Sequence, residues 1–211
     1  MLLLAFDTAT PAITVAVHDG GTIVGEASGH GAMAHGELLA PAIRDAMQQA
    51  GAAMGDLTDV AVGVGPGPFT GLRVGVVTAL ALGSTLGLAQ HGVCSLDVVA
   101  ADVQADAEFL VATDARRKEV YWARYGADGV RLDGPHVSFP ADLAHQYPDL
   151  LTYGRGGELY DGVLRPAGEA QDPRAAALAS AVIAGRMIEV PLEPLYLRRP
   201  DAVPQIVNNR A

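Results

Sequence analysis

The stretch from Gly63 to Arg73, with the apolar segment after it, places the strongest constraint on how this chain can fold. A mostly apolar run over 57–64 leads into Gly-Pro-Gly-Pro, which predicts a buried strand followed by a rigid turn. Beyond the turn, small residues recur at every fourth position, at Gly71, Gly75, Ala79 and Gly83. On a helix over 71–88 this spacing forms one stripe with little side-chain bulk, against which another backbone can approach closely. The pattern therefore predicts a closely packed helix, with its stripe turned toward this subunit or toward another.

The turn itself allows two interpretations. Glycine-rich loops that open a helix can bind phosphate through free backbone N–H groups. Pro66 and Pro68 have no N–H group to donate, however, and no lysine follows as it does in a P-loop. We therefore favour a rigid turn in which Thr70 caps the helix and Phe69 anchors the loop in apolar surroundings.

The composition excludes several classes of protein. The chain has 211 residues and a formal net charge of −10, which argues against direct binding of nucleic acid, because phosphates require a cationic surface. Cys94 is the only cysteine, so no internal disulfide can form, as expected in a reducing compartment. The first residues lack the basic region of a signal peptide, and the apolar segment 74–89 is shorter than a membrane span. We expect a cytoplasmic protein without a membrane segment.

The second half of the chain repeats features of the first. Residues 2–7 and 109–114 are both apolar runs that end at an aspartate, and each is followed by an alternating segment that leads to Asp-Gly. We interpret this as an internal duplication with its seam near residue 102. The predicted domains are an N-terminal lobe over 1–102 and a smaller C-terminal lobe over 103–211. The proline-rich tail, 191–200, is expected to lie along the body and to be able to return onto the first lobe.

The hydrophobic pattern predicts the individual elements. Strands are expected at 2–6, 13–17, 22–28, 56–64, 93–96, 109–114, 120–125, 130–138 and 150–153. Helices are expected at 36–50, 71–88, 97–102 and 173–188.

Five segments, in the same order over nearly the whole chain, resemble the TsaB (YeaZ) family. They are 5–10, 35–39, 65–73, 114–121 and 194–198. The resemblance implies an α/β fold of the two-lobed actin/Hsp70/sugar-kinase type, with a duplicated mixed β-sheet, helices and a reduced second lobe. It also implies a non-catalytic partner of TsaD, which transfers a threonylcarbamoyl group to the adenosine beside the anticodon of certain tRNAs. TsaE, an ATPase, is the implied further partner.

The turn after the first strand contains the candidates for cofactor binding, which are Asp7, Thr8 and Thr10. Kinases and ATPases of this superfamily carry Asp-x-Gly-Thr here, whereas Ala9 occupies the glycine position in this chain and limits how closely the backbone can approach a phosphate. Asp7 could hold a hydrated Mg²⁺, but we favour a turn-capping role. The alternative function is a small ATP-dependent phosphotransferase or ATPase, with Asp114 as a further residue on the phosphate side.

No catalytic or metal-binding set is expected. The place that carries a metal-binding His-x-x-x-His in TsaD relatives is 95–99 here, where Asp97 is the only candidate ligand, and we interpret it as a charge at a helix N-terminus. His30 and His35 are five residues apart and do not share a helix face. No Ser/His/Asp arrangement is recognisable, so the peptidase label used for this branch of the superfamily receives no support.

We expect the helices over 36–50 and 71–88 to pack side by side and to form the interface with TsaD. The candidate interface residues are Leu38, Leu39, Ile43, Met47, Gly71, Arg73, Val74, Gly75, Val77, Thr78 and Ala79. Without TsaD the same surface is expected to form a homodimer. We expect tRNA to bind only through the complex and no cofactor on the subunit itself, with ATP and Mg²⁺ considered only for the assembled complex.

Overall fold

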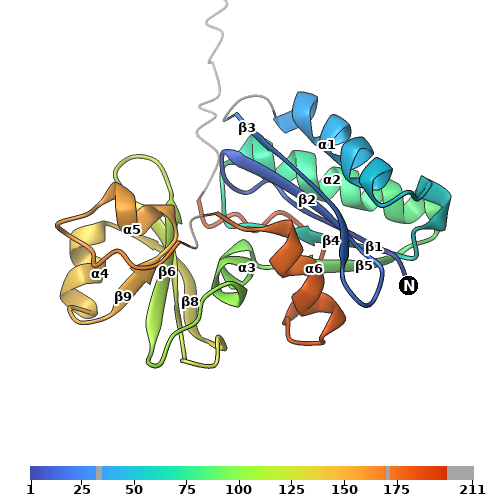
Figure 1. Ribbon diagram of the computed structural model, residues 1–211. Coiled ribbons are helices and arrows are strands. Elements are labelled where there is room, and N and C mark those ends of the chain that lie inside the picture. Colours follow the sequence, from blue (N-terminus) through green and yellow to red (C-terminus); the bar gives the residue numbers. More distant parts are fainter. Residues whose placement is uncertain (32–34, 170–171, 199–211) are drawn as a thin grey trace, which may run out of the picture.

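The computed structural model describes residues 1–31, 35–169 and 172–198, and two mixed β-sheets lie side by side in it (Figure 1). The first sheet has the strand order β10-β5-β4-β1-β2-β3. Its strands are β1 (Leu3–Asp7), β2 (Ala12–His18), β3 (Ile23–His30), β4 (Asp59–Gly63), β5 (Ala89–Val93) and β10 (Glu189–Val190). The strand β1 pairs antiparallel with β2 and parallel with β4.

The second sheet repeats this topology with fewer strands, in the order β8-β7-β6-β9. Its strands are β6 (Phe109–Asp114), β7 (Val120–Tyr125), β8 (Arg131–Ser138) and β9 (Leu151–Tyr153). The strand β6 pairs antiparallel with β7 and parallel with β9, as β1 does with β2 and β4. The duplication predicted from the two apolar runs is thus confirmed, with a reduced second copy.

Helices cover both faces of the first sheet, because alternate residues of its strands are apolar on both sides. On one face, α1 (His35–Gln49) and α2 (Phe69–Leu86) pack on a core that includes Leu4 and Phe6 of β1. On the other face, α6 (Ala175–Ile183) packs against Leu3 and Ala5. A short 3-10 helix, Met54–Asp56, follows α1.

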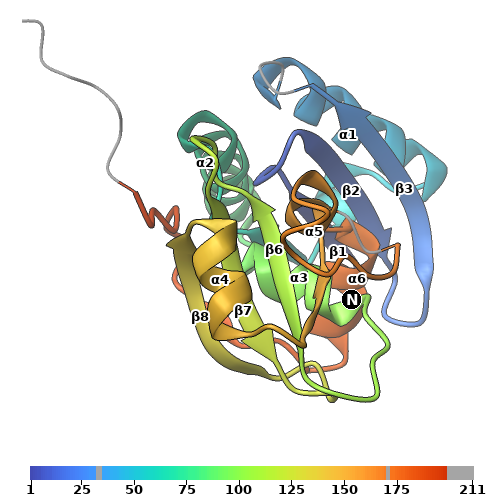
Figure 2. The same ribbon diagram turned by 90° about the vertical axis from the view of Figure 1, so that its left-hand side faces the viewer.

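The helix α3 (Ser95–Ala101) lies between the two sheets and joins their cores. Val98 of α3 packs in the core under α6, whereas Leu96 and Val99 pack against the second sheet. The far face of the second sheet is covered by α4 (Pro140–Gln146) and α5 (Arg155–Leu159). Figure 2 shows these two helices in front of the second sheet, with α3 behind it.

The C-terminal part of the described chain returns to the first sheet. The helix α6 contacts β1 and β2, and β10 forms the edge strand beside β5. Residues from beyond position 102 therefore complete the first sheet and its second face.

Several predicted elements differ from the structure. The strand expected at 93–96 is β5 at Ala89–Val93, and α3 begins immediately afterwards. The helix expected over 173–188 is the shorter α6, followed by β10, while α4 and α5 were not predicted at all. The strand β5 was misplaced because Gln90 and His91 are polar and Ala89 and Gln90 are exposed, so its first half has no apolar pattern. Its pairing with β4 and β10, rather than an apolar pattern, makes this segment a strand.

Among the described residues, α2 is the one helix whose length and composition would allow it to cross a bilayer. In the structure, one side of α2 packs on β4 and β5 of the first sheet.

Candidate functional site

Asp7, at the end of β1, lies buried in a hydrogen-bonded turn. Its Oδ1 atom accepts a hydrogen bond from the backbone N–H of Ala9 at 2.7 Å, and its Oδ2 atom accepts one from the Ser95 hydroxyl at 2.6 Å. Burial raises the pKa of Asp7 to about 6, although the hydrogen bonds from Ser95 and Ala9 oppose this rise. The carboxyl group thus connects the end of β1 to the start of α3, and this is the turn-capping role favoured from the sequence.

The other two cofactor candidates are also buried and engaged within the protein. The Thr8 hydroxyl donates a hydrogen bond to the carbonyl oxygen of Gly71 at 2.8 Å. The Thr10 hydroxyl oxygen accepts one from the backbone N–H of Ala12 at 3.2 Å. Asp7, Thr8 and Thr10 therefore do not present their polar atoms together to a ligand in this conformation.

The equivalent turn of the second sheet faces the first across a small cleft. Asp114 accepts a hydrogen bond from the backbone N–H of Arg116 at 2.8 Å, and the Arg116 guanidinium lies 3.7 Å from its carboxylate. The cleft between the two turns, lined among others by Thr10, Asp114 and Arg155, has a volume of about 140 Å³. Pockets for drug-sized ligands usually measure roughly 300 to 1,000 Å³. The cleft as it stands is thus too small for a nucleotide.

The Gly/Pro turn before α2 differs from prediction at two residues. Pro68 is the N-cap of α2 and makes no side-chain capping bond, so Thr70 lies inside the helix and is not its cap. Phe69 was expected in apolar surroundings but is 37% exposed. Its ring stacks on Tyr196 with a centroid distance of 5.1 Å, and the Arg73 guanidinium lies 4.0 Å from its centroid on a ring face. Phe69 thus packs against Tyr196 of the C-terminal tail and does not pack in the hydrophobic core.

The small-residue stripe of α2 packs within this subunit. A Cβ atom on Gly71 would lie 2.4 Å from the carbonyl oxygen of Thr8, and one on Gly75 would lie 2.4 Å from the Thr8 hydroxyl. Ala79 is completely buried. The expectation that Gly71, Gly75 and Ala79 lie on the surface that a partner contacts is therefore corrected. These residues are small because the turn after β1 and the first sheet lie directly against the helix.

A groove lies between α1 and α2, and three further predicted interface residues contribute to its lining. The groove has a volume of about 550 Å³, and Thr78 of α2, which is half-buried, lines it. Ile43 and Met47 of α1 also line it but are only 6% and 4% exposed, so the expectation that these two side chains lie on the surface that a partner contacts is corrected. Its remaining walls include Ala40, Met54 and Leu82. We call it the α1–α2 groove.

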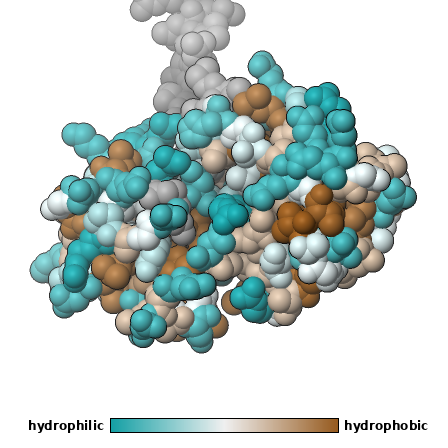
Figure 3. Space-filling view, in the orientation of Figure 1, coloured by the Kyte–Doolittle hydropathy of each residue, from teal (hydrophilic) through white to brown (hydrophobic). Residues whose placement is uncertain are grey.

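The rest of the predicted interface residues divide between surface and core. Val77 and Arg73 project from the outer face of α2, with 60% of Val77 exposed. Leu38 and Val74 are half-buried, and Leu39 is buried in the core. The face shown in Figure 3 is mainly hydrophilic over α1, where Glu37, Arg44 and Asp45 are exposed.

The tail of the described chain spans both sheets, as expected of its proline-rich sequence. The N–H of Leu195 donates to the carbonyl oxygen of Val64 at 2.8 Å. Arg198 donates to the carbonyl oxygen of Ala115 at 2.9 Å and forms an ion pair with Glu119. Arg199 and Pro200, the last residues of the predicted tail, lie outside the described residues.

Asp97, in the first turn of α3, makes contacts that the sequence did not indicate. Its Oδ1 atom accepts a hydrogen bond from the Tyr125 hydroxyl at 2.7 Å and lies 3.4 Å from Nε of Arg131. Burial raises the pKa of Asp97, while Arg131 and the Tyr125 hydrogen bond oppose the rise. Besides placing a charge at a helix N-terminus, Asp97 thus links α3 to the second sheet. No signal in the sequence pairs it with residues that lie 28 and 34 positions further along.

Within the described parts of the chain, no three His, Cys, Asp or Glu side chains are grouped so that they could hold a metal ion.

Comparisons with known proteins agree with this architecture. Residues 18–152 match the family model of TsaD, described as tRNA N6-adenosine threonylcarbamoyltransferase. A protein of Mycobacterium tuberculosis is 46% identical over 208 residues, which cover 97% of this chain and 95% of that protein. The Escherichia coli tRNA threonylcarbamoyladenosine biosynthesis protein TsaB is 32% identical over 94% of this chain and 95% of its own length. The solved structure of YeaZ from Pseudomonas aeruginosa superposes with a TM-score of 0.74 at 30% identity, covering 93% of this chain and 99% of that one.

Proposed function

Because the chain belongs to the family of the tRNA threonylcarbamoyladenosine biosynthesis protein TsaB, we propose that it is a non-catalytic subunit that binds TsaD. Family membership gives it a role in the biosynthesis of threonylcarbamoyladenosine in tRNA. In this proposal, its contribution is to dock on TsaD and support the transferase. The match of residues 18–152 to the TsaD model indicates a shared fold over that part. Equivalent helix pairs of the two proteins can then meet in one bundle.

The observation that carries the proposal is the accessible apolar surface of α1 and α2. The α1–α2 groove is lined on the α2 side by the half-buried Leu82, while Ile43 and Met47 on the α1 side expose only 6% and 4% of their surface. Beside it, Val77 and Leu80 expose apolar side chains along the outer face of α2. Contiguous apolar surface of this kind marks sites of protein association. A specific interface of ordinary size buries about 1,600 Å² in total, which two helices and their flanks can supply.

The state of the turn after β1 supports a non-catalytic role. The side chains of Asp7 and Thr8 make hydrogen bonds within the protein, and the neighbouring cleft has a volume of about 140 Å³. An ATP-dependent phosphotransferase would need these groups turned toward a nucleotide. Isothermal calorimetry with Mg-ATP and an assay for phosphate release test this point. We expect neither binding nor turnover by the isolated subunit, and turnover would contradict a non-catalytic role.

The further partners follow from the same proposal. In this proposal, TsaE binds the complex that this chain forms with TsaD. The net charge of −10 supports contact with tRNA through the complex alone. In isolation, the α1–α2 surface has no TsaD to cover it, and a second copy of the chain is its expected occupant.

The docking surface can be tested with two matched variants. Val77→Asp places a charge on the outer face of α2, and Val163→Asp adds the same charge at a site near the second sheet where 46% of the valine is exposed. We expect Val77→Asp to weaken binding of purified TsaD by at least about tenfold, which corresponds to roughly 1.4 kcal/mol. Val163→Asp should bind as the wild type does, and circular dichroism should show both variants folded. Wild-type affinity of folded Val77→Asp would contradict the proposed surface.

A further inference from the structure

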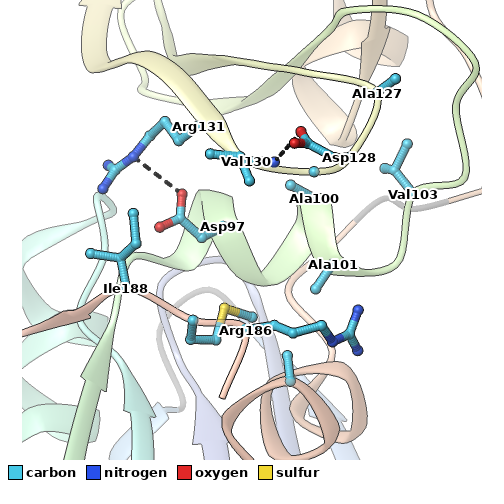
Figure 4. A pocket seen from close by; sticks show the side chains of 13 residues that line it. Asp97, Ala100, Ala101, Val103, Ala127, Asp128, Val130, Arg131, Arg186 and Ile188 are labelled. Atoms are coloured by element: carbon cyan, nitrogen blue, oxygen red, sulfur yellow. Dashed lines mark hydrogen bonds and ion pairs between the residues drawn. The ribbon is translucent and has the colours of Figure 1, made fainter. Parts of the chain in front are cut away.

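A pocket of about 310 Å³ lies where α3, the turn between β7 and β8, and the segment after α6 meet (Figure 4). We call it the α3 pocket. It is distinct from the cleft at Asp7 and Asp114 and from the α1–α2 groove, since it shares no lining residue with either. Its volume corresponds to roughly ten water molecules at about 30 Å³ each, so it suits a small molecule rather than a nucleotide.

One buried carboxylate lines this pocket with an oxygen still to be satisfied. The Asp97 side chain is 9% exposed, and both of its contacts, with Tyr125 and Arg131, are made by the Oδ1 atom. Among the residues that the structure describes, the Oδ2 atom has no hydrogen-bond partner. Oδ2 is not one of the fully enclosed polar atoms that lack a partner, so it is open to a donor that enters the pocket. The pocket therefore offers this acceptor to an incoming donor, beside a second carboxylate of its lining, Asp128, whose Oδ1 atom accepts from the backbone N–H of Val130.

The other walls are mostly aliphatic. They comprise Ala100, Ala101, Val103, Val130, Met187 and Ile188. Val130 and Ile188 are 53% and 55% exposed, so the apolar lining extends to solvent. A ligand with an aliphatic body would cover this surface when bound.

The charges around the pocket decide which polar group fits. In Figure 4, Asp97 and Arg131 point toward each other, while the Arg186 guanidinium extends on the other side of the pocket, away from them. An anionic group beside Asp97 would meet a carboxylate oxygen, and the Nε atom of Arg131 already faces that carboxylate. A cationic nitrogen at Oδ2 would leave both contacts of Oδ1 in place and give a charge-assisted hydrogen bond.

We propose that the α3 pocket binds a small aliphatic amine in its ammonium form, with the ammonium group donating to Oδ2 of Asp97. The aliphatic body then lies against Ala100, Ala101 and Ile188. Since Asp97 belongs to α3 and its partners Tyr125 and Arg131 belong to the second sheet, the bound amine adds a contact at the junction of the two sheets. This inference does not depend on the proposed binding of TsaD.

Three probes with the same four-carbon length test which polar group the pocket prefers: n-butylammonium is cationic, 1-butanol is neutral and butyrate is anionic. Each is titrated into the full-length protein at neutral pH, and NMR follows the methyl groups of Ala100 and Ala101. We expect saturable shifts with n-butylammonium, binding of 1-butanol weaker by about tenfold or more, and no saturable shift with butyrate. Absence of saturable shifts with n-butylammonium, or equal binding of all three probes, would overturn the proposal.

Two variants then assign the contacts. Asp97→Asn keeps an oxygen that can accept from Tyr125 but removes the charge, so the preference for the ammonium over the alcohol should disappear. Ala101→Leu fills the pocket from a position four residues further along α3 without altering the carboxylate, and it should weaken binding of n-butylammonium and 1-butanol alike. Circular dichroism establishes that each variant is folded. An ammonium preference that persists in Asp97→Asn, or unchanged binding to Ala101→Leu, would also overturn the proposal.

A last comparison separates a free amine from a lysine side chain of another protein, which carries the same group. Nα-acetyl-lysine N-methylamide presents the ammonium on a chain flanked by peptide bonds. Tighter binding of this probe than of n-butylammonium would assign the pocket to a protein side chain, and weaker binding would assign it to a free amine. Either result supports recognition of an ammonium group at Asp97.

Discussion

The Ser95 hydroxyl donates a 2.6 Å hydrogen bond to Asp7 and thereby joins the first turn of α3 to the end of β1. The Ser95 oxygen in turn accepts from the backbone N–H of Gly65 at 3.1 Å, so the turn before α2 belongs to the same network. Gly63 makes room for it, because a Cβ atom there would lie 1.7 Å from Oδ2 of Asp7. Three connections of the first sheet therefore meet at one buried carboxyl group.

Replacement of this carboxyl group should change how stability depends on pH. The pKa of Asp7 is raised from 3.8 to about 6 by burial, so the native state binds this proton more tightly than the unfolded chain does. Its contribution to the free energy of unfolding is full below the unfolded pKa and is lost as the pH rises through the native pKa. The shift of about two units corresponds to roughly 3 kcal/mol. Urea unfolding at several pH values should show this loss in the wild type but not in Asp7→Asn.

Asp114→Asn is the matched control for Asp7→Asn. It makes the same change in the equivalent turn of the second sheet, where the carboxylate is partly exposed and bonds the N–H of Arg116. This variant should keep the pH dependence that Asp7 causes. Identical pH profiles of the wild type and Asp7→Asn would contradict the assignment.

Substitution of the helix stripe should affect folding before it affects binding. In Gly75→Ala the new Cβ atom would lie 2.4 Å from the Thr8 hydroxyl oxygen, and we expect a loss of about 2 kcal/mol or more in the free energy of unfolding. Gly36→Ala, in α1, meets no atom within 4 Å and should stabilise by roughly 0.5 kcal/mol through helix propensity. Thermal unfolding measures both. Equal stability of the two variants would show that the stripe is not closely packed.

The hydroxyl of Tyr125 should stabilise the junction of the two sheets. Tyr125→Phe removes the 2.7 Å hydrogen bond to the buried Asp97, at an expected cost of about 2 kcal/mol, as is usual for a bond to a charged group. Tyr153 also packs on Phe109, and its hydroxyl has no hydrogen-bond partner within the described parts of the chain. Tyr153→Phe should therefore cost much less. Denaturant unfolding distinguishes them, and equal losses would rule out a special role for the Asp97 contact.

The attachment of β10 should weaken as the pH rises. Nδ1 of His91 lies 2.7 Å from Glu189 of β10 and Nε2 lies 3.2 Å from Asp59, and only the protonated ring can donate from both nitrogens. Burial opposes protonation of His91, but its hydrogen bonds to Glu189 and Asp59 outweigh this effect and raise its pKa. The stabilisation is therefore full below the unfolded pKa and is lost as the pH rises through the higher native pKa.

Hydrogen exchange of the peptide that contains β10 measures this effect. After correction for the intrinsic rate, its protection should fall as the pH rises above the ordinary histidine pKa of 6.5 in the wild type. In His91→Gln the protection should be low and independent of pH over this range. His136→Gln removes another carboxylate-paired histidine, on the exposed strand β8, and should leave β10 unaffected. If the protection of β10 in the wild type did not depend on pH, the predicted role of His91 in holding β10 would be contradicted.

The sequence by itself determined the repeated part of the fold. Apolar runs that end at Asp7 and Asp114 placed β1 and β6 correctly, and the alternating segments after them became the antiparallel strands beside each. These features are local: burial on both faces requires a continuous apolar run, and a capping aspartate bonds to a backbone N–H two residues away. The family resemblance rested on the same local segments.

Tertiary structure alone decided which way the surfaces face. The spacing of Gly71, Gly75 and Ala79 predicted a close approach but not its partner, because a period of four defines a helix face and not what lies against it. Folding brought Thr8 to that face, and the exposed side of α2 with the α1–α2 groove is left as the surface proposed for docking. The link between Asp97 and Tyr125 likewise joins residues far apart in the chain, whose proximity depends on how the two sheets pack. A single sequence shows no periodic pattern that would predict such long-range contacts. Each contact depends on where the fold places every element between the two residues.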